Sequence, residues 1–99
     1  MKKFAVIEMG PHYIPETHRA QFDLPAMTMY LRTVRNFEEA MACVDELAAD
    51  GVGCIELCGA FGPEKARTLI ERTDGKIAIG YSTNFPEQDD MFQQFFSAP

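Results

Sequence analysis

The stretch VGCIELCGAFGPEKARTLIERTDGKIAIGYS, residues 52–82, decides the fold. It opens and closes with short apolar runs that have the composition of buried strands. Between the two runs, Gly62 and Pro63 suit the N-cap and the first position of a helix, and Ala66 and Leu69 recur at helical spacing. A strand, a helix and a strand of these lengths predict a right-handed crossover between parallel strands.

Two further strands are predicted upstream. The run KFAVIEM, residues 3–9, is apolar almost throughout, which is typical of a strand covered on both faces. The run MTMYLRTV, residues 27–34, alternates: its Met and Leu residues point one way, and Thr28, Tyr30 and Arg32 point the other. This pattern predicts a strand with one wetter face, close to an edge of the sheet.

Two more helices are predicted from their end signals and spacing. Asn36 and Glu39 have the spacing of a capping box, apolar residues follow at helical intervals, and Gly51 supplies the stop. After a proline, a final helix is predicted over residues 87–96.

The order is therefore strand, long loop, strand, helix, strand, helix, strand, helix. It predicts an α/β fold with a small, four-stranded, largely parallel sheet and three helices in a single domain, residues 1–99, because a second domain would be too small to hold its own core. A ferredoxin-like α+β fold is the alternative, since its βαββαβ order differs by one swap. Residues 10–26 contain three prolines and no period, so they are predicted to be a long loop and a candidate for function.

Composition narrows the class of protein. Apolar residues make up 46% of the chain, which indicates a globular protein rather than a disordered one. The net charge is −6 and no run of Lys or Arg occurs, which argues against nucleic acid or a membrane surface as a partner. The first apolar run is too short for a signal peptide or a membrane span. The three cysteines are an odd number without a C-x-x-C motif, so we expect reduced thiols in a cytoplasmic protein.

Two strand ends resemble one another, VIEMG and IELCG, and each carries a glutamate, Glu8 and Glu56. In a parallel sheet, ligands bind outside the carboxyl ends of the strands. If the two strands are neighbours in matching register, both carboxylates lie on the same side and form a candidate catalytic pair for general acid–base chemistry. The alternative is a local role, in which each glutamate accepts hydrogen bonds from loop amides or pairs with Arg19 or Arg32.

The first loop adds His12 and His18 as further catalytic candidates. Together with Glu16 they are weak candidates for metal ligands, but the spacing matches no metal signature and Pro15 disfavours a helical ligand face, so no metal site is predicted. Cys58 could act as a nucleophile with either histidine as base, although no spacing requires this. Exposed histidines in a loop are the simpler interpretation.

The turn of Gly59, Ala60, Phe61 and Gly62, with Lys65 one turn into the following helix, is a candidate anion site. Free amides at a helix start attract phosphates and carboxylates. The turn contains neither a Walker motif nor G-x-G-x-x-G, and a plain strand-to-helix turn explains it equally well.

The last predicted helix carries four large apolar side chains within two turns: Met91, Phe92, Phe95 and Phe96. A chain of this length has limited interior to receive them. They predict a homo-oligomer with this helix at the contact, and packing on the chain's own sheet is the alternative.

With these residues described, the chain is similar to a family of small bacterial and archaeal proteins classed as a domain of unknown function. The similarity rests on KKFAVIEMGPHYIPETHRAQFD, VRNFEEA, GVGCIELCGAFGPEKARTLIE and KIAIGY, which cover most of the chain. The similarity indicates neither an activity nor a cofactor. The residues themselves favour binding of a small anionic ligand at the strand ends, with general acid–base catalysis as a natural extension. A non-catalytic module that binds a metabolite or metal, and a structural homo-oligomer without a small-molecule site, are the alternatives.

Overall fold

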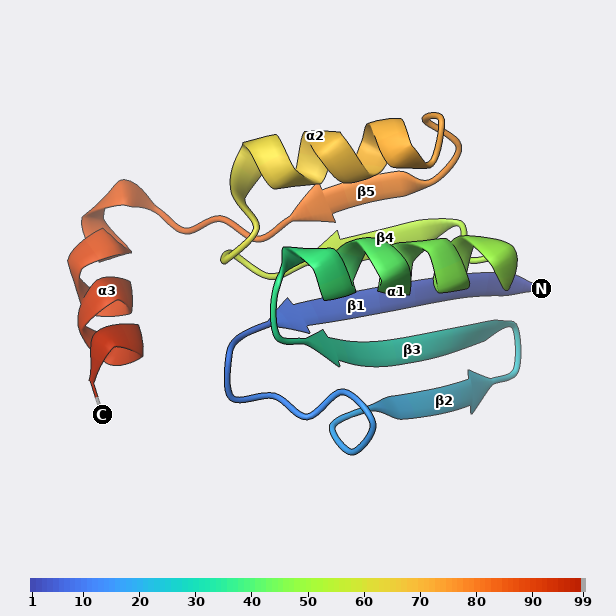
Figure 1. Ribbon diagram of the computed structural model, residues 1–99, viewed down its shortest axis with the longest axis horizontal. Coiled ribbons are helices and arrows are strands. Elements are labelled where there is room, and N and C mark those ends of the chain that lie inside the picture. The colour runs from blue at the N-terminus through green and yellow to red at the C-terminus, as the bar shows by residue number, and fades with distance from the viewer. Residues whose placement is uncertain (99) are drawn as a thin grey trace.

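The computed structural model describes residues 1–98 and shows a five-stranded sheet with two helices packed on one face (Figure 1). The predicted α/β class is confirmed. The elements are β1 (Lys2–Met9), β2 (Ala20–Leu24), β3 (Met27–Val34), α1 (Phe37–Ala49), β4 (Cys54–Leu57), α2 (Gly62–Arg72), β5 (Ala78–Tyr81), the 3-10 helix η1 (Pro86–Gln88) and α3 (Asp89–Ser97). Pro99, the last residue of the expected 1–99 domain, lies outside the described residues.

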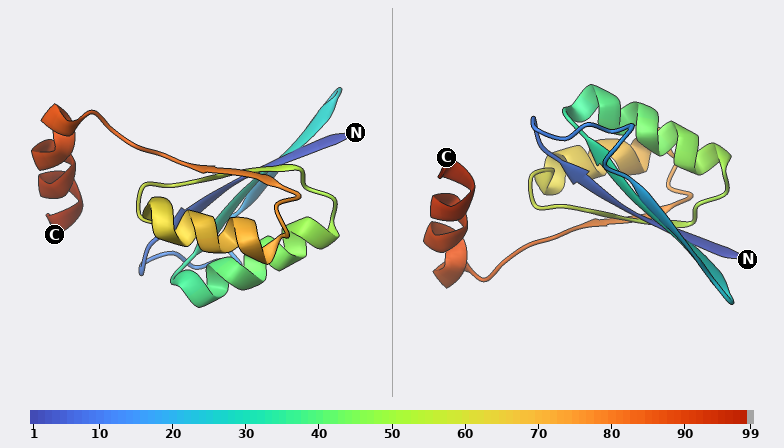
Figure 2. Two further views of the ribbon diagram at one scale, coloured as in Figure 1. Left: turned by 90° about the horizontal axis from the view of Figure 1, so that it is seen from above. Right: turned by 90° about the horizontal axis from the view of Figure 1, so that it is seen from below.

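The strands lie in the order β2-β3-β1-β4-β5, and only β2 runs antiparallel to its neighbour. The chain passes from β3 across β1 to β4, and then on to β5, always in the same direction. Right-handed crossovers taken in one direction place their helices on the same side of a sheet. Accordingly, α1 and α2 cover one face and no helix packs on the opposite face, which we call the open face (Figure 2).

The predicted number of four strands was wrong, because β2 lies within the predicted loop 10–26 and shortens that loop to residues 10–19. The segment AQFDL has only five residues and ends beside Pro25. A tight connection returns the chain from β2 into β3, and the two strands pair from Ala20 with Leu31 to Leu24 with Met27. The mostly parallel sheet that results is also not the ferredoxin-like alternative.

The core lies between the sheet and its two helices. Ala5 and Ile7 of β1 and Ile55 and Leu57 of β4 face the helices and are almost completely buried. Alternate residues of a strand point to opposite faces, so Phe4 and Val6 point to the open face, where they are only half-buried. The expectation that residues 3–9 are covered on both faces is therefore met on one face only.

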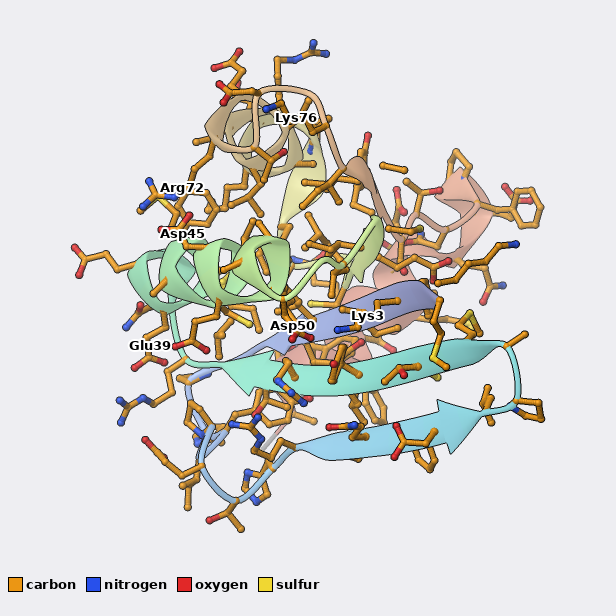
Figure 3. All side chains as sticks on the ribbon, turned by 90° about the vertical axis from the view of Figure 1, so that its right-hand side faces the viewer. Lys3, Glu39, Asp45, Asp50, Arg72 and Lys76 are labelled. Atoms are coloured by element: carbon orange, nitrogen blue, oxygen red, sulfur yellow. The ribbon has the colours of Figure 1, made fainter. Side chains whose placement is uncertain are left out.

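The alternating strand β3 places its polar side against the helix layer. Thr28 and Tyr30 are 6% and 7% exposed on that side. The Tyr30 hydroxyl donates a hydrogen bond to Asp50 at the end of α1, and Lys3 Nζ lies 3.3 Å from the same carboxylate (Figure 3). Asp50 thus allows the Tyr30 side chain to be buried, and Thr28 Oγ1 donates to Met1 Sδ at 3.6 Å. The apolar side of β3 lies on the open face.

Both helix starts differ in detail from the predicted caps. The Asn36 side chain accepts a hydrogen bond from the Glu39 amide, as predicted, but the Glu39 carboxylate binds Arg35 instead of Asn36. At the second helix Gly62 is the first helical residue and no side chain caps the turn. A bidentate ion pair between Arg72 and Asp45 joins α2 to α1 (Figure 3).

The predicted final helix is present as η1 followed by α3. Figures 1 and 2 show α3 held away from the sheet and from the other helices by an extended segment that continues the direction of β5. Every residue from 82 to 98 is exposed.

Candidate functional site

Glu8 and Glu56 lie on neighbouring parallel strands at the carboxyl end of the sheet. Glu56 is in register with Val6, two residues before Glu8 in β1. Residues two apart on a strand share a face, so both glutamates project from the open face. The ordinary spacing of strands and residues puts their Cα atoms roughly 8 Å apart, within reach of a common ligand. Glu8 is half-buried and Glu56 is exposed.

Tyr13 is a third polar residue at this end of the sheet, and no sequence pattern predicts its place there. Its ring packs close to Gly10, where an added Cβ atom would lie 3.2 Å from Tyr13 Cε2. Partial burial raises the pKa of the Tyr13 hydroxyl, and the nearby Glu8 and Cys58 raise it further. The hydroxyl is therefore protonated at neutral pH and can donate a hydrogen bond beside Glu8.

Cys58 follows β4 directly and joins the ends of the two central strands. Its Sγ accepts a hydrogen bond from the Met9 amide at 3.3 Å, and its own amide donates to the Ile7 carbonyl oxygen. The thiol is half-buried and packs against the core. The structure thus gives Cys58 a role in holding β1 and β4 in register beside Glu8.

The two histidines lie in the first loop, and the His18 ring meets the Tyr13 ring edge to face, with centroids 6.1 Å apart. His12 and His18 are both exposed. His18 Nδ1 accepts a hydrogen bond from the Ile14 amide at 2.9 Å, and the His18 carbonyl oxygen accepts one from Thr33. One ring nitrogen of His18 is therefore engaged in a hydrogen bond within the loop itself. In residues 1–98, His12, Glu16 and His18 form no cluster with the composition of a metal site.

The glycine turn is built around a buried aromatic ring. Phe61 is 3% exposed, and its ring meets that of Phe37 edge to face with centroids 6.4 Å apart. Lys65 Nζ lies 6.0 Å from the centroid of the Phe37 ring, over the start of α1. Of the five predicted anion-site residues, Phe61 is held by the core, so an anion would meet backbone amides near Gly59 and Gly62.

Two hollows in the described surface lie away from the glutamates. A hollow of about 450 Å³ runs between α2 and β5. A second, of about 280 Å³, is lined by Arg19 and Arg32 beside Tyr30. Partial burial lowers the pKa of Arg32, and the nearby charge of Arg19 lowers it further.

The two arginines do not neutralise the glutamates. Arg32 Nη1 donates to the carbonyl oxygens of Ala20 and Leu31, and its guanidinium lies 4.8 Å from the centroid of the Tyr30 ring. Among residues 1–98, the ion pairs involve neither Glu8 nor Glu56.

The fold and these strand ends define an α/β protein with one open sheet face that carries two carboxylates. The model of a family of unknown function, DUF6506, matches residues 2–97. The chain belongs to that family, as the sequence similarity predicted. No curated protein and no solved structure matches the chain. None of the helices in the described part of the chain is long and apolar enough to cross a membrane.

Proposed function

We propose that the protein binds a small organic anion at the carboxyl end of the open face, with Glu8 and Glu56 facing the ligand. One observation supports this above all: two carboxylates project from adjacent parallel strands on a face that no helix of residues 1–98 covers. Loops diverge at this edge, since the loop after β1 leads toward β2 and the loop after β4 leads to α2. Ligands of open α/β sheets bind at such points.

The polar groups have complementary chemistry. An ionised carboxylate accepts a hydrogen bond from a ligand hydroxyl or amine, and it acts as a base toward an acidic proton. The Tyr13 hydroxyl, whose raised pKa keeps it protonated, supplies a donor next to Glu8. This combination supports general acid–base chemistry with Glu8 or Glu56 as base, and His12 and His18 remain outlying candidates.

The negative end of the ligand needs a separate partner, because the two glutamates would repel it. Amides of the Gly59–Gly62 turn and the uncapped start of α2 point to that partner, since a helix start carries unpaired N–H groups. Gly59 also lies beside the strand end of β5, where an added Cβ atom would be 3.5 Å from the Ser82 carbonyl oxygen. A ligand held by both groups would reach around the carboxyl edge of the sheet, because α2 packs on the face opposite the two carboxylates.

A non-catalytic module that binds a metabolite or metal through the same groups is the second candidate. The half-buried position of Glu8 beside Tyr13 supports binding equally well with and without turnover. The free cysteines, Cys43, Cys54 and Cys58, support a cytoplasmic location, where thiols stay reduced.

Thermal-shift measurements with a panel of small carboxylates, phosphates and amino acids test the proposal. We expect one class to raise the melting temperature of the wild type, and the variants E8Q and E56Q to lose that increase. Glu71→Gln, an exposed glutamate on α2, is the matched control and should keep it. The absence of any shift across the panel, together with native mass spectra that show no co-purified small molecule, would contradict the proposal.

A further inference from the structure

The helix α3 lacks the support that a helix of its length needs. It has nine residues, and isolated helices shorter than about 12–15 residues are only marginally stable in water. Met91 and Phe95 are four residues apart, as are Phe92 and Phe96, so these apolar side chains form one face of the helix. Phe95 and Phe96 are 75% and 76% exposed, and their rings pack only edge to face on each other, with centroids 5.1 Å apart. This apolar face needs a surface to cover it.

The open face of the sheet also carries apolar side chains that stay partly exposed. Its central row runs across all five strands, because register partners share a face: Phe22, Met29, Phe4, Cys54 and Ala78. The next row adds Leu31 and Val6 and then reaches Glu56, so on this row the apolar patch ends at β1. Phe22 is 51% exposed although it belongs to a strand. Adjoining apolar side chains that stay partly exposed on one face are typical of an interaction surface.

We propose that α3 of one copy packs on the open face of a second copy, and that the reciprocal contact closes a two-fold dimer. Each chain carries both halves of this interface, as an isologous dimer requires. An aromatic side chain buries about 150–250 Å². Each α3 helix carries three phenylalanines, and the exposed Phe85 lies before the helix. The rings of two helices, together with the strand residues that they face, therefore approach the roughly 1,600 Å² of a standard stable interface.

Charge favours a second copy over the chain's own sheet. The linker leaves β5 at the carboxyl edge, so α3 folded back on its own sheet would bring Glu87, Asp89 and Asp90 toward Glu8 and Glu56. Like charges brought together in this way destabilise the arrangement. A second copy can instead place the acidic start of α3 near Lys2, which lies on the open face at the amino end of β1. Residues 82–98 contain no Lys or Arg, which also argues against an anionic membrane as the surface that covers α3.

Mass measurement by light scattering and sedimentation on the full chain tests this inference. The wild type should be a dimer at micromolar concentration. A helix variant, F95S with F96S, and a sheet variant, F22S with L24S, should each weaken the dimer by a hundredfold or more, on the order expected for two exposed apolar side chains. Ile14→Ser changes an exposed apolar residue in the first loop and should leave the dimer unchanged. Cooperative melting by circular dichroism shows that each variant is folded.

Mixing the two variants distinguishes this arrangement from others. The intact helix of the sheet variant can dock on the intact sheet of the helix variant, so we expect the mixture to recover a dimer that neither variant forms alone. A dimer that survives the helix variant would show sheet-to-sheet packing, and a dimer that survives the sheet variant would show contact between two α3 helices. A wild type that stays monomeric would place α3 on its own sheet or leave it free. Any of these three results overturns the inference, and none depends on whether the Glu8 site binds a ligand.

Discussion

Glu56 lies in register with Val6, so its side chain and that of Glu8 leave the same face of two hydrogen-bonded parallel strands. The arrangement follows from a crossover that carries the chain from β3 across β1 to β4 and makes β1 and β4 neighbours. Neither carboxylate forms an ion pair within residues 1–98. Both are therefore free to meet a ligand.

Replacing either glutamate should separate binding from stability. E8Q and E56Q remove charges that stabilise no observed contact, so we expect the free energy of unfolding to change by no more than about 0.5 kcal/mol. Urea unfolding of each variant checks this expectation. A loss of several kcal/mol would assign the carboxylates a structural role instead of a binding role.

The pH dependence of stability should reflect Asp50. The hydrogen bond from Tyr30, and then that from Lys3, hold the pKa of Asp50 below its ordinary value of 3.8. A lowered pKa in the folded state contributes stability above the unfolded-state value, and this contribution is lost as the pH falls through the folded-state value. We expect urea midpoints to fall as the pH drops below about 3.8.

Asp50→Asn should make this fall smaller without removing it, because Arg35 and Arg72 also hold the pKa values of Glu39 and Asp45 below their ordinary values. Asp74→Asn is a suitable control: Asp74 has φ 55°, a conformation that asparagine also adopts readily. An Asp50→Asn variant with the same pH profile as the wild type would show that Tyr30 and Lys3 do not stabilise the ionised form.

Cys43 should react more slowly with an alkylating reagent in the native protein than in the unfolded protein. Burial raises its pKa from 9.0 to about 11, which leaves roughly a hundredfold less reactive thiolate at mildly alkaline pH. Peptide mapping after limited treatment with iodoacetamide should find Cys43 far less modified in the native protein than in the protein unfolded in guanidinium. Equal rates in the two states would contradict the partial burial of this α1 side chain.

The turn before α2 should depend on glycine at one position. Gly62 has φ 70°, a left-handed conformation that costs other residues about 1–2 kcal/mol, and no atom lies within 4 Å of an added Cβ. Gly62→Ala should therefore lower the free energy of unfolding by about this amount through the backbone alone. Gly53→Ala, which has equal space and no positive φ, should be neutral or slightly stabilising. Equal effects of the two substitutions would rule out backbone strain as the cause.

Much of the fold could be predicted because the periodic patterns are local. The strand–helix–strand unit of residues 52–82 and the helix after Asn36 have clear end signals, and both are present. The strand β2 was missed because five residues beside Pro25 carry too little pattern to be distinguished from a loop. Its stability comes from pairing with β3, which is a tertiary property.

The burial of each face could not be read from alternation alone. In β3 the polar side faces the helices because Tyr30 finds Asp50 as a partner at the end of α1. Similarly, nothing in the pattern of β1 shows that one of its apolar faces stays uncovered within the chain. That outcome depends on the handedness and direction of two crossovers.

Part of the candidate site could also be predicted from local sequence patterns. Strand-end glutamates with similar flanking residues indicated a shared face, but the contribution of Tyr13 depends on the path of the first loop, which has no periodic signal. The two histidines follow from residue type alone: the loop places the His18 ring against Tyr13, and a role for either histidine stays a prediction.

A crystal structure of the full chain, purified without a tag and crystallised with the best compound from the thermal-shift panel, tests the shared site most directly. We expect density for the compound on the open face, within hydrogen-bonding distance of both Glu8 and Glu56. Carboxylates directed apart into bulk water, with the compound bound elsewhere or absent, would contradict the proposed site.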